Sequence, residues 1–270
     1  MSQQSCAVLI GATGGIGQAI AEQLCKQGKP LVLVGRNEHK LESLRKRLRE
    51  LYPLVYTISR ICDISSAEDR QQLLNVVEQL PMGVDLLINN AGINHLALFE
   101  QQSDEEISEI IQINSVYPLL LLKLFLPYFL QRDKPVQIIN VGSTFGAIAS
   151  PGFVAYSASK FALRGATEAL GREYADTPVR IRYFSPRATL TDLNSEQVVS
   201  MNRAMKVQMD PPERVAKELV NFLNNRKSIY YVGWPEKLFV VINQLLPKLV
   251  SSEFRKSLPL IRKYASEKSS

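Results

Sequence analysis

Three side chains in this sequence have the types and spacing for acid–base chemistry. Tyr156 and Lys160 are four residues apart, and Ser143 lies thirteen residues before the tyrosine. On a helix, residues i and i+4 share a face, so the phenol and the ammonium can enter one cavity. A cation beside a phenol lowers the phenol pKa from about 10. Tyr156 is therefore a candidate proton donor and acceptor for a carbonyl/alcohol pair, although this spacing alone is also typical of an exposed helix face.

A glycine-rich turn follows the first apolar run of the chain. Cys6–Ile10 has the pattern of a buried parallel strand, Gly11–Gly17 contains four glycines, and Gln18–Cys25 reads as a helix. The glycines let the backbone approach a pyrophosphate, and the helix N-terminus offers free N–H groups. The pattern predicts a dinucleotide site, although its G-x-x-x-G-x-G spacing differs from the commoner G-x-G-x-x-G.

These motifs, taken in order, resemble the short-chain dehydrogenases/reductases of the single-domain kind. The resemblance runs from Gly11 to about Pro212, and its ordered set is specific although each piece alone is not. The matching positions are Gly11–Gly17, Asp63, Asn89–Gly92, Asn114, Ser143, Tyr156, Lys160, Pro186 and Thr191. In the segment Ser185–Thr191, Arg187 replaces the glycine usual in the family. We expect this arginine either to point to solvent or to place a cation near the substrate mouth.

Apolar runs and helical patterns alternate along the chain, which predicts an α/β fold: a single Rossmann-type doubly wound parallel sheet with helices on both faces. After the first strand, we expect strands at Leu31–Val34, Tyr56–Ile61, Asp85–Asn89, Gln137–Val141, Arg180–Phe184 and Ile229–Val232. Helices are expected at Leu41–Leu51, Ala67–Leu80, Glu105–Leu130, Phe153–Ala175 and Pro212–Asn224. The catalytic domain would span residues 1–235, with a lid at about 192–212, and a C-terminal extension would span residues 236–270.

The resemblance implies a role for each catalytic position. Ser143 would polarise a carbonyl, Tyr156 would protonate it, and Lys160 would lower the tyrosine pKa and hold the nicotinamide ribose. Asn114 would hold a water of a proton relay, or would instead be a structural polar residue. The implied cofactor-binding residues are Gly11, Thr13, Gly15, Ile16, Gly17, Arg36, Asp63, Ile64, Asn90, Ala91, Gly92, Tyr156, Lys160, Pro186, Thr189 and Thr191.

The end of the second strand indicates which cofactor is preferred. No acidic residue stands there to hold a ribose 2′-hydroxyl, and Arg36 follows the strand instead. A guanidinium matches a 2′-phosphate in charge and geometry, and Thr13 could add a hydroxyl donor. We therefore predict NADP(H) rather than NAD(H), the alternative being that Arg36 only faces solvent.

The expected lid contains methionines at helical spacing, among them Met201 and Met205. Methionine adapts to apolar ligands of varied shape, so we predict that these residues, with Ser143 and Tyr156, contact an apolar ketone or ketoacyl chain. The alternative is a lid that packs on its own core.

Composition favours one globular domain in a reducing compartment, and we expect a cytoplasmic protein. The 270 residues are 46% hydrophobic, and the three cysteines form no C-x-x-C or metal-ligand pattern. The apolar stretch from Leu119 to Leu130 is interrupted by Lys123 and Pro127, so we predict a helix in the core or a subunit interface rather than a membrane span. The resemblance also implies a homodimer or homotetramer.

The end of the chain is basic and amphipathic. Residues 226–270 hold nine Lys or Arg against three Asp or Glu, which accounts for the whole net charge of +6. An apolar stripe runs through Leu238, Val241, Ile242, Leu245, Leu249 and Val250, with a kink expected at Pro247. Such a segment can lie on an anionic membrane, cover the substrate pocket or pack on another subunit. No aromatic and basic surface for nucleic acid is evident.

Together these patterns predict an NADP(H)-dependent oxidoreductase that transfers a hydride between nicotinamide and the carbonyl or secondary alcohol of an apolar substrate. Two alternatives belong to other classes of protein. One is a non-catalytic NADP(H)-binding regulator, which the intact Ser143, Tyr156 and Lys160 set disfavours. The other is a membrane-surface scaffold that acts through its basic tail.

Overall fold

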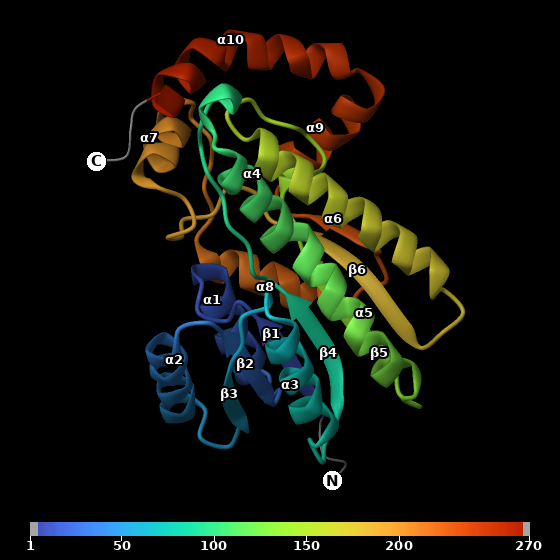
Figure 1. Cartoon of the computed structure of the whole chain (residues 1–270). Helices are drawn as coiled ribbons and strands as arrows, with labels where there is room; N and C mark the ends of the chain where they lie inside the picture. Colours follow the sequence, from blue (N-terminus) through green and yellow to red (C-terminus); the bar gives the residue numbers. More distant parts are fainter. Residues whose placement is uncertain (1–4, 267–270) are drawn as a thin grey trace.

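The computed structural model describes residues 5–266, which form a seven-stranded parallel sheet in the order β3-β2-β1-β4-β5-β6-β7 (Figure 1). The predicted fold class is confirmed, and every predicted strand lies within one residue of its expected bounds. The strand order reverses between β1 and β4, which is where open α/β sheets bind ligands. The strands are β1 (Cys6–Ile10), β2 (Leu31–Gly35), β3 (Thr57–Ile61), β4 (Val84–Asn89), β5 (Val136–Val141), β6 (Val179–Ser185) and β7 (Ile229–Tyr231).

The central strands are apolar on both faces because helices cover both sides of the sheet. In β1, Ala7 and Leu9 pack into one hydrophobic cluster, whereas Val8 and Ile10 pack into the other. This division follows the two-residue period of a strand. The first cluster includes side chains of α1 (Gly15–Lys26), α2 (Glu38–Leu51) and α8 (Pro212–Leu223). The second includes side chains of α3 (Ala67–Glu78), α5 (Tyr117–Leu130) and α6 (Val154–Glu173).

The single helix predicted over Glu105–Leu130 is interrupted by a short π-helical segment. The chain forms α4 (Asp104–Ile111), then the π segment Gln112–Val116, and then α5. Within residues 5–266, Asp104–Leu130 is also the one stretch that is long and apolar enough for a membrane span, by length and composition alone. Leu121, Phe125 and Phe129 are fully buried on the sheet side of α5, as expected of a core helix.

A buried chain of polar side chains ties the centre of the sheet to α6. Asn89 Nδ2 donates to Asn140 Oδ1 at 2.8 Å, and Asn140 Nδ2 donates to Thr167 Oγ1 at 2.9 Å. Asn89 ends β4 and Asn140 lies near the end of β5, so these bonds hold α6 in register with the strand ends. Hydrogen bonds between fully buried groups specify one arrangement, because an unpaired partner would be costly.

Three helices form a cap beyond the carboxyl edge of the sheet (Figure 1). The predicted lid contains α7 (Glu196–Ala204), and the chain ends in α9 (Trp234–Leu245) and α10 (Pro247–Ser266). The kink expected at Pro247 is instead a break between two helices, with Leu246 between them and Pro247 in the first turn of α10. Helix α10 packs on both α7 and α9. Residues 267–270 of the predicted extension lie outside the described residues.

Candidate active site

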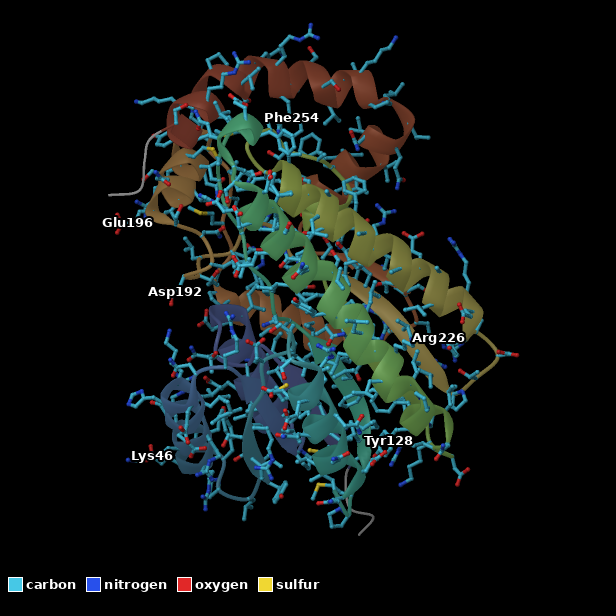
Figure 2. All side chains as sticks on the ribbon, in the orientation of Figure 1. Lys46, Tyr128, Asp192, Glu196, Arg226 and Phe254 are labelled. Atoms are coloured by element: carbon cyan, nitrogen blue, oxygen red, sulfur yellow. The ribbon has the colours of Figure 1, made fainter. Side chains whose placement is uncertain are left out.

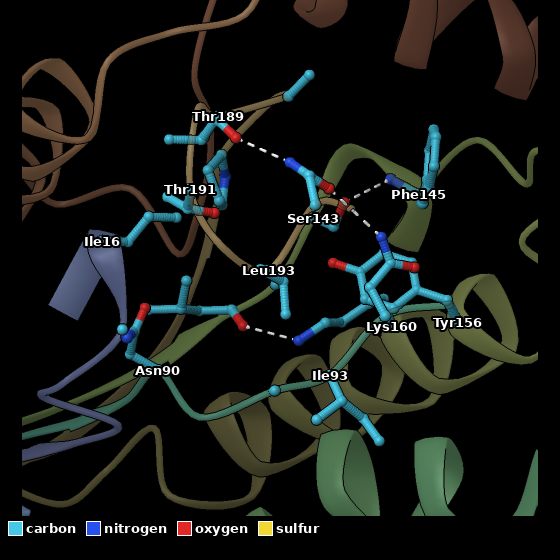
Figure 3. Close-up of a pocket in the computed structure, with 18 of the residues that line it drawn as sticks. Ile16, Asn90, Ile93, Ser143, Phe145, Tyr156, Lys160, Thr189, Thr191 and Leu193 are labelled. Atoms are coloured by element: carbon cyan, nitrogen blue, oxygen red, sulfur yellow. Dashed lines mark hydrogen bonds between the residues drawn. The ribbon is translucent and has the colours of Figure 1, made fainter. Parts of the chain in front are cut away.

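A cavity of about 550 Å³ lies over the carboxyl ends of the strands, and most of the predicted site residues line it (Figure 3). Two predicted residues, Gly17 and Asn114, lie outside this lining. The predicted residues that the structure brings together there are Gly11, Thr13, Gly15, Ile16, Arg36, Asp63, Ile64, Asn90, Ala91, Gly92, Ser143, Tyr156, Lys160, Pro186, Thr189, Thr191, Met201 and Met205.

The Ser143 and Tyr156 side chains both line this cavity, and the serine hydroxyl is close enough to act on the tyrosine pKa. Ser143 follows β5, and its hydroxyl also accepts the main-chain N–H of Phe145 at 3.2 Å. Tyr156 lies in the first turn of α6, and its ring packs edge-on against Phe145. Burial raises the pKa of Tyr156 to about 12, while the Ser143 side chain acts in the opposite direction. The phenol is therefore held as a proton donor.

Lys160 lies one turn further along α6 and is 4% exposed. Its Nζ donates to the Val141 carbonyl at 3.3 Å and lies 5.7 Å from the centre of the Tyr156 ring. Burial lowers the lysine pKa to about 8. The Tyr156 pKa lies above its ordinary value in this structure because burial penalises the phenolate, and the role of Lys160 in lowering that pKa stays a prediction.

Tyr183, which sequence reasoning did not single out, fixes the Ser143 loop through hydrogen bonds to its main chain. Its hydroxyl accepts the Ser143 N–H at 3.2 Å and donates to the Ser143 carbonyl at 3.3 Å. A side chain at Gly142 would overlap the Tyr183 ring, so glycine is required there by close approach. The signal that could have found this contact is the pairing of β5 with β6, which brings the two segments side by side.

Asn114 lies in the π segment and is fully buried beside the cavity wall. Its Oδ1 accepts the Ile93 N–H at 2.8 Å, and its Nδ2 donates to the Ile93 carbonyl and to Ser159 Oγ. Both amide hydrogens are therefore used, and one acceptor position of Oδ1 remains. A Cβ added to Gly92 would lie 3.0 Å from Asn114 Oδ1 and 3.4 Å from Lys160 Nζ, so the two polar atoms approach the same point.

The glycine turn brings three segments together without intervening side chains. Gly11 has φ of +74°, and a Cβ there would lie 2.7 Å from the Ala91 nitrogen. A Cβ on Gly15 would lie 2.7 Å from Thr191 Cγ2, whereas one on Gly17 would collide with the Gly11 carbonyl. Gly17 thus permits α1 to pack under the turn, and Gly11 and Gly15 leave main chain facing the cavity. Main chain that faces a cavity at a helix N-terminus is the setting that a bound pyrophosphate needs.

Arg36 stands at the carboxyl end of β2 on the rim of the cavity. Its side chain is exposed, and no hydrogen bond or ion pair within residues 5–266 engages its guanidinium. The neighbouring Asp63 accepts the Ser65 N–H at 2.9 Å, which lowers the Asp63 pKa, and the charge of Arg36 lowers it further. The guanidinium therefore has donors available for a ligand.

Arg187 does not face solvent, and it lines the cavity as a cation that is paired with carboxylates. It is 7% exposed and donates to both carboxylate oxygens of Asp210, at 2.8 and 2.7 Å. Its third nitrogen forms an ion pair with Glu236 at 3.2 Å. These contacts join the loop after β6 to the segment before α8 and to the first turn of α9. The arginine therefore links the cavity lining to helix α9 through buried ion pairs.

The far wall of the cavity is apolar. Met201 and Met205 line it as predicted, together with Val198. The structure adds aromatic and aliphatic side chains that sequence reasoning missed, and these pack with the methionines in one cluster: Phe145, Phe153, Phe254 and Ile261. Phe254 and Ile261 belong to α10, and Ile261 is only 1% exposed. The tail therefore forms part of the wall.

Comparison with known proteins decides the family. A family model described as short chain dehydrogenase matches residues 5–202. The chain belongs to this family. It is 32% identical to the 3-oxoacyl-(acyl-carrier-protein) reductase of Rickettsia bellii over 232 residues, which cover 84% of the chain and 92% of the relative. The short-chain dehydrogenase is thus an oxidoreductase, and its last helices, α9 and α10, lie beyond the family match.

Solved structures share the whole fold. A short-chain dehydrogenase from Burkholderia phymatum, solved with NAD, superimposes with a TM-score of 0.82 at 21% identity, covering 92% of this chain and 95% of the other. The actinorhodin polyketide ketoreductase, solved with NADPH, gives a TM-score of 0.74 at 26% identity, covering 86% and 97%. The family uses nicotinamide cofactors, since these two solved members hold NAD and NADPH respectively.

Proposed function

We propose that this short-chain dehydrogenase is an NADPH-dependent reductase of apolar ketones, with 3-oxoacyl chains as the leading substrate class. The observation that carries the proposal is that the hydroxyl groups of Ser143 and Tyr156 line the same cavity, close enough for the serine to lower the tyrosine pKa, next to an apolar wall that includes Met201. Two convergent donors can hold and protonate one carbonyl oxygen. The similarity to a 3-oxoacyl reductase supports the substrate class.

The residues around the cavity fit a nicotinamide dinucleotide. The main chain of the turn, with Gly11, Gly15 and Ile16, lines the cavity and would lie against the pyrophosphate. Asp63 and Ile64 would flank the adenine, and Asn90 to Gly92 would pass the adenosine ribose. Asn194 Nδ2 donates a hydrogen bond to the Thr189 carbonyl oxygen at 2.8 Å. The Thr189 amide would hold the nicotinamide carboxamide, together with Thr191 and Pro186.

Arg36 supports NADPH over NADH. Its guanidinium is exposed at the rim, close to the position that a ribose at the end of β2 would take. A 2′-phosphate would give this cation a charge-assisted hydrogen bond, with Thr13 as a second donor. NADH has no group that could make the same contact.

The side chains of the site would donate the proton and stabilise the negative charge that develops on the carbonyl oxygen. When bound, the cofactor supplies a hydride to the carbonyl carbon. Tyr156 Oη would give its proton to the carbonyl oxygen, while Ser143 Oγ donates a hydrogen bond to that oxygen. The charge on Lys160 would stabilise the resulting phenolate. A water near Gly92, between Lys160 Nζ and Asn114 Oδ1, would return the proton from solvent.

We also propose that the protein acts as a homodimer or homotetramer. Helices α5 and α6 each expose large apolar side chains, and α6 contacts the π segment that leads into α5 (Figure 1). Leu120 and Leu130 on α5 and Val154 and Phe161 on α6 are between 37% and 43% exposed. A second copy packed on this face would remove them from water.

Conversion of Tyr156 to phenylalanine tests the proposed reaction. Tyr156→Phe should lose nearly all NADPH-dependent reduction across a panel of apolar ketones and 3-oxoacyl thioesters, because the donated proton is gone. NADPH binding, followed by its fluorescence, should persist because the ring remains. Tyr174→Phe, at the far end of α6, is the matched control and should keep wild-type rates. Near-wild-type turnover by Tyr156→Phe would remove the acid assignment.

A further inference from the structure

The outer face of α9 is apolar and faces solvent. Trp234, Leu238, Val241 and Leu245 follow one another at four, three and four residues, which places them on one face of the helix. Their side chains are 73%, 49%, 48% and 73% exposed. Single exposed apolar residues are ordinary, but a stripe that runs the length of a helix indicates a binding surface.

The opposite side of α9 is already packed against the body of the protein. Val240 is 3% exposed and packs with Ala147 and Ile148, just beyond the Ser143 loop. Asn243 Nδ2 donates to the Ala147 carbonyl at 3.0 Å. Rotation of α9 to bury its outer stripe would break these contacts, so the stripe needs a partner from outside the chain.

Helix α10, which packs on α9, presents cations to solvent. Lys248, Arg255 and Arg262 are spaced seven residues apart on one face, and all three are exposed. No ion pair within residues 5–266 engages them, whereas the neighbouring Lys256 is paired with Glu253 at 2.6 Å. Figure 2 shows nitrogen-tipped side chains that project from α10 away from the rest of the molecule.

We propose that α9 and α10 dock the protein on an anionic lipid membrane. Apolar side chains of a surface helix enter the boundary between headgroups and acyl chains, and adjacent cations contact the lipid phosphates. Helix α9 has 12 residues, so it is about 18 Å long and too short to cross a hydrocarbon core of about 30 Å. Helix α9 therefore lies on the surface, and the 20-residue α10 does not meet the composition of a membrane span, since within residues 5–266 only Asp104–Leu130 does.

Charge favours a lipid surface over a second copy of the chain. Residues 226–270 carry nine Lys or Arg against three Asp or Glu, and the rest of the chain is balanced. Two copies that met through this face would bring like charges together, which opposes association. An anionic bilayer would neutralise the same cations.

Docking would place the cavity wall next to the bilayer. Phe254 and Ile261 of α10 line the cavity, so the helix that meets lipid on its outer side contacts substrate on its inner side. Apolar substrates concentrate in membranes, and they would then enter near α10. This consequence rests on the proposed function, whereas the docking itself does not.

Vesicle flotation with the full-length protein tests the docking directly and requires no turnover. Vesicles of phosphatidylcholine alone are compared with vesicles that contain phosphatidylglycerol. The protein should float with the anionic vesicles at low salt and progressively detach as salt rises, because attraction at the surface is screened over about 8–10 Å at physiological ionic strength. It should not float with neutral vesicles to the same extent.

Three sets of substitutions separate the apolar stripe, the cations and nonspecific effects. Removal of three cations should weaken binding by roughly 100-fold, at about 1 kcal/mol for each, and removal of the stripe should abolish it. The matched control removes exposed apolar residues elsewhere and should bind as wild type. The sets are Lys248→Gln/Arg255→Gln/Arg262→Gln, Leu238→Ser/Val241→Ser/Leu245→Ser, and the control Leu54→Ser/Ile61→Ser/Phe99→Ser.

Light scattering and thermal unfolding of each variant distinguish membrane docking from subunit contact and from loss of folding. The proposal requires that the stripe variant keep the wild-type mass and melting temperature while it loses vesicle binding. A smaller assembly in this variant would assign the face to another subunit and overturn the proposal. Failure of the wild type to float with anionic vesicles at low salt would overturn it as well, as would equal loss of binding in the control variant.

Discussion

Lys160 Nζ lies 5.7 Å from the centre of the Tyr156 ring, and the same burial shifts the two pKa values in opposite directions. The tyrosine pKa rises to about 12 and the lysine pKa falls to about 8, because removal from water penalises both the phenolate and the ammonium. The folded protein therefore holds a charged lysine at a free-energy cost near neutral pH. Substrate and cofactor would have to stabilise the charges that the reaction needs.

The buried lysine should destabilise the fold at neutral pH. Between the folded pKa of about 8 and the unfolded value of about 10.4, the unfolded chain binds the proton and the folded chain does not, so this contribution to stability rises with pH. Lys160→Met removes the cost, and its free energy of unfolding should exceed that of the wild type at pH 7. This advantage should shrink by pH 10 in urea titrations. Lys46→Met, at an exposed site, is the control. An advantage independent of pH would contradict the assignment.

Gly92→Ala should slow turnover without removing a catalytic group. The added methyl would lie 3.0 Å from Asn114 Oδ1 and 3.4 Å from Lys160 Nζ, where the proposed relay water would sit. We expect kcat to fall by roughly 10- to 100-fold with little change in the KM for ketone. Gly165→Ala on α6, where a Cβ meets nothing within 4 Å, is the control. A normal kcat would place the relay elsewhere.

Arg36→Gln should weaken NADPH far more than NADH, since only NADPH carries the 2′-phosphate. Loss of one charge-assisted contact of about 1.5–3 kcal/mol corresponds to roughly 10- to 150-fold in Kd. Titration of both cofactors by fluorescence measures the two losses. Arg60→Gln, an exposed arginine on the adjacent strand β3, should change neither affinity. Equal losses for both cofactors in Arg36→Gln would assign the residue to the fold.

Arg187→Met should destabilise the protein because it leaves Glu236 without its buried cation and leaves Asp210 with only the half-exposed Arg214. Removal of one partner from a buried ion pair costs about 3–5 kcal/mol. The triple variant Arg187→Met/Asp210→Asn/Glu236→Gln should regain much of this stability in urea unfolding, because no uncompensated charge remains. If the single and triple variants were equally unstable, the loss would come from packing and not from charge.

Ile261 should set the size of the substrate, because it forms part of the cavity wall from α10. Ile261→Phe should lower kcat/KM for a bulky apolar ketone relative to a small one by about tenfold or more. Ile261→Ala should shift the ratio the other way. Leu249→Phe, on the exposed side of the same helix, is the control. Unchanged selectivity in both Ile261 variants would exclude the tail from the substrate chamber.

The sequence by itself determined the sheet, the glycine turn and most of the residues that surround the proposed cofactor and proton-transfer positions. Each strand is a run of apolar residues whose signal is local, so its bounds could be predicted to within one residue. In a parallel sheet all strand ends meet at one edge, so residues that follow different strands, such as Ser143 and Asn90, were expected to converge. These inferences needed only the local pattern and the topology that it implies.

The tertiary structure decided what depends on distant partners. Arg187 pairs with Asp210 and Glu236, which lie 23 and 49 residues away, and nothing near Arg187 in the sequence indicates them. Asn114 in the π segment bonds to Ile93, 21 residues earlier, and the apolar wall of the cavity includes Ile261 from the last helix. The pKa of Tyr156 likewise follows from burial, a property of the packed chain that a four-residue spacing to Lys160 does not encode.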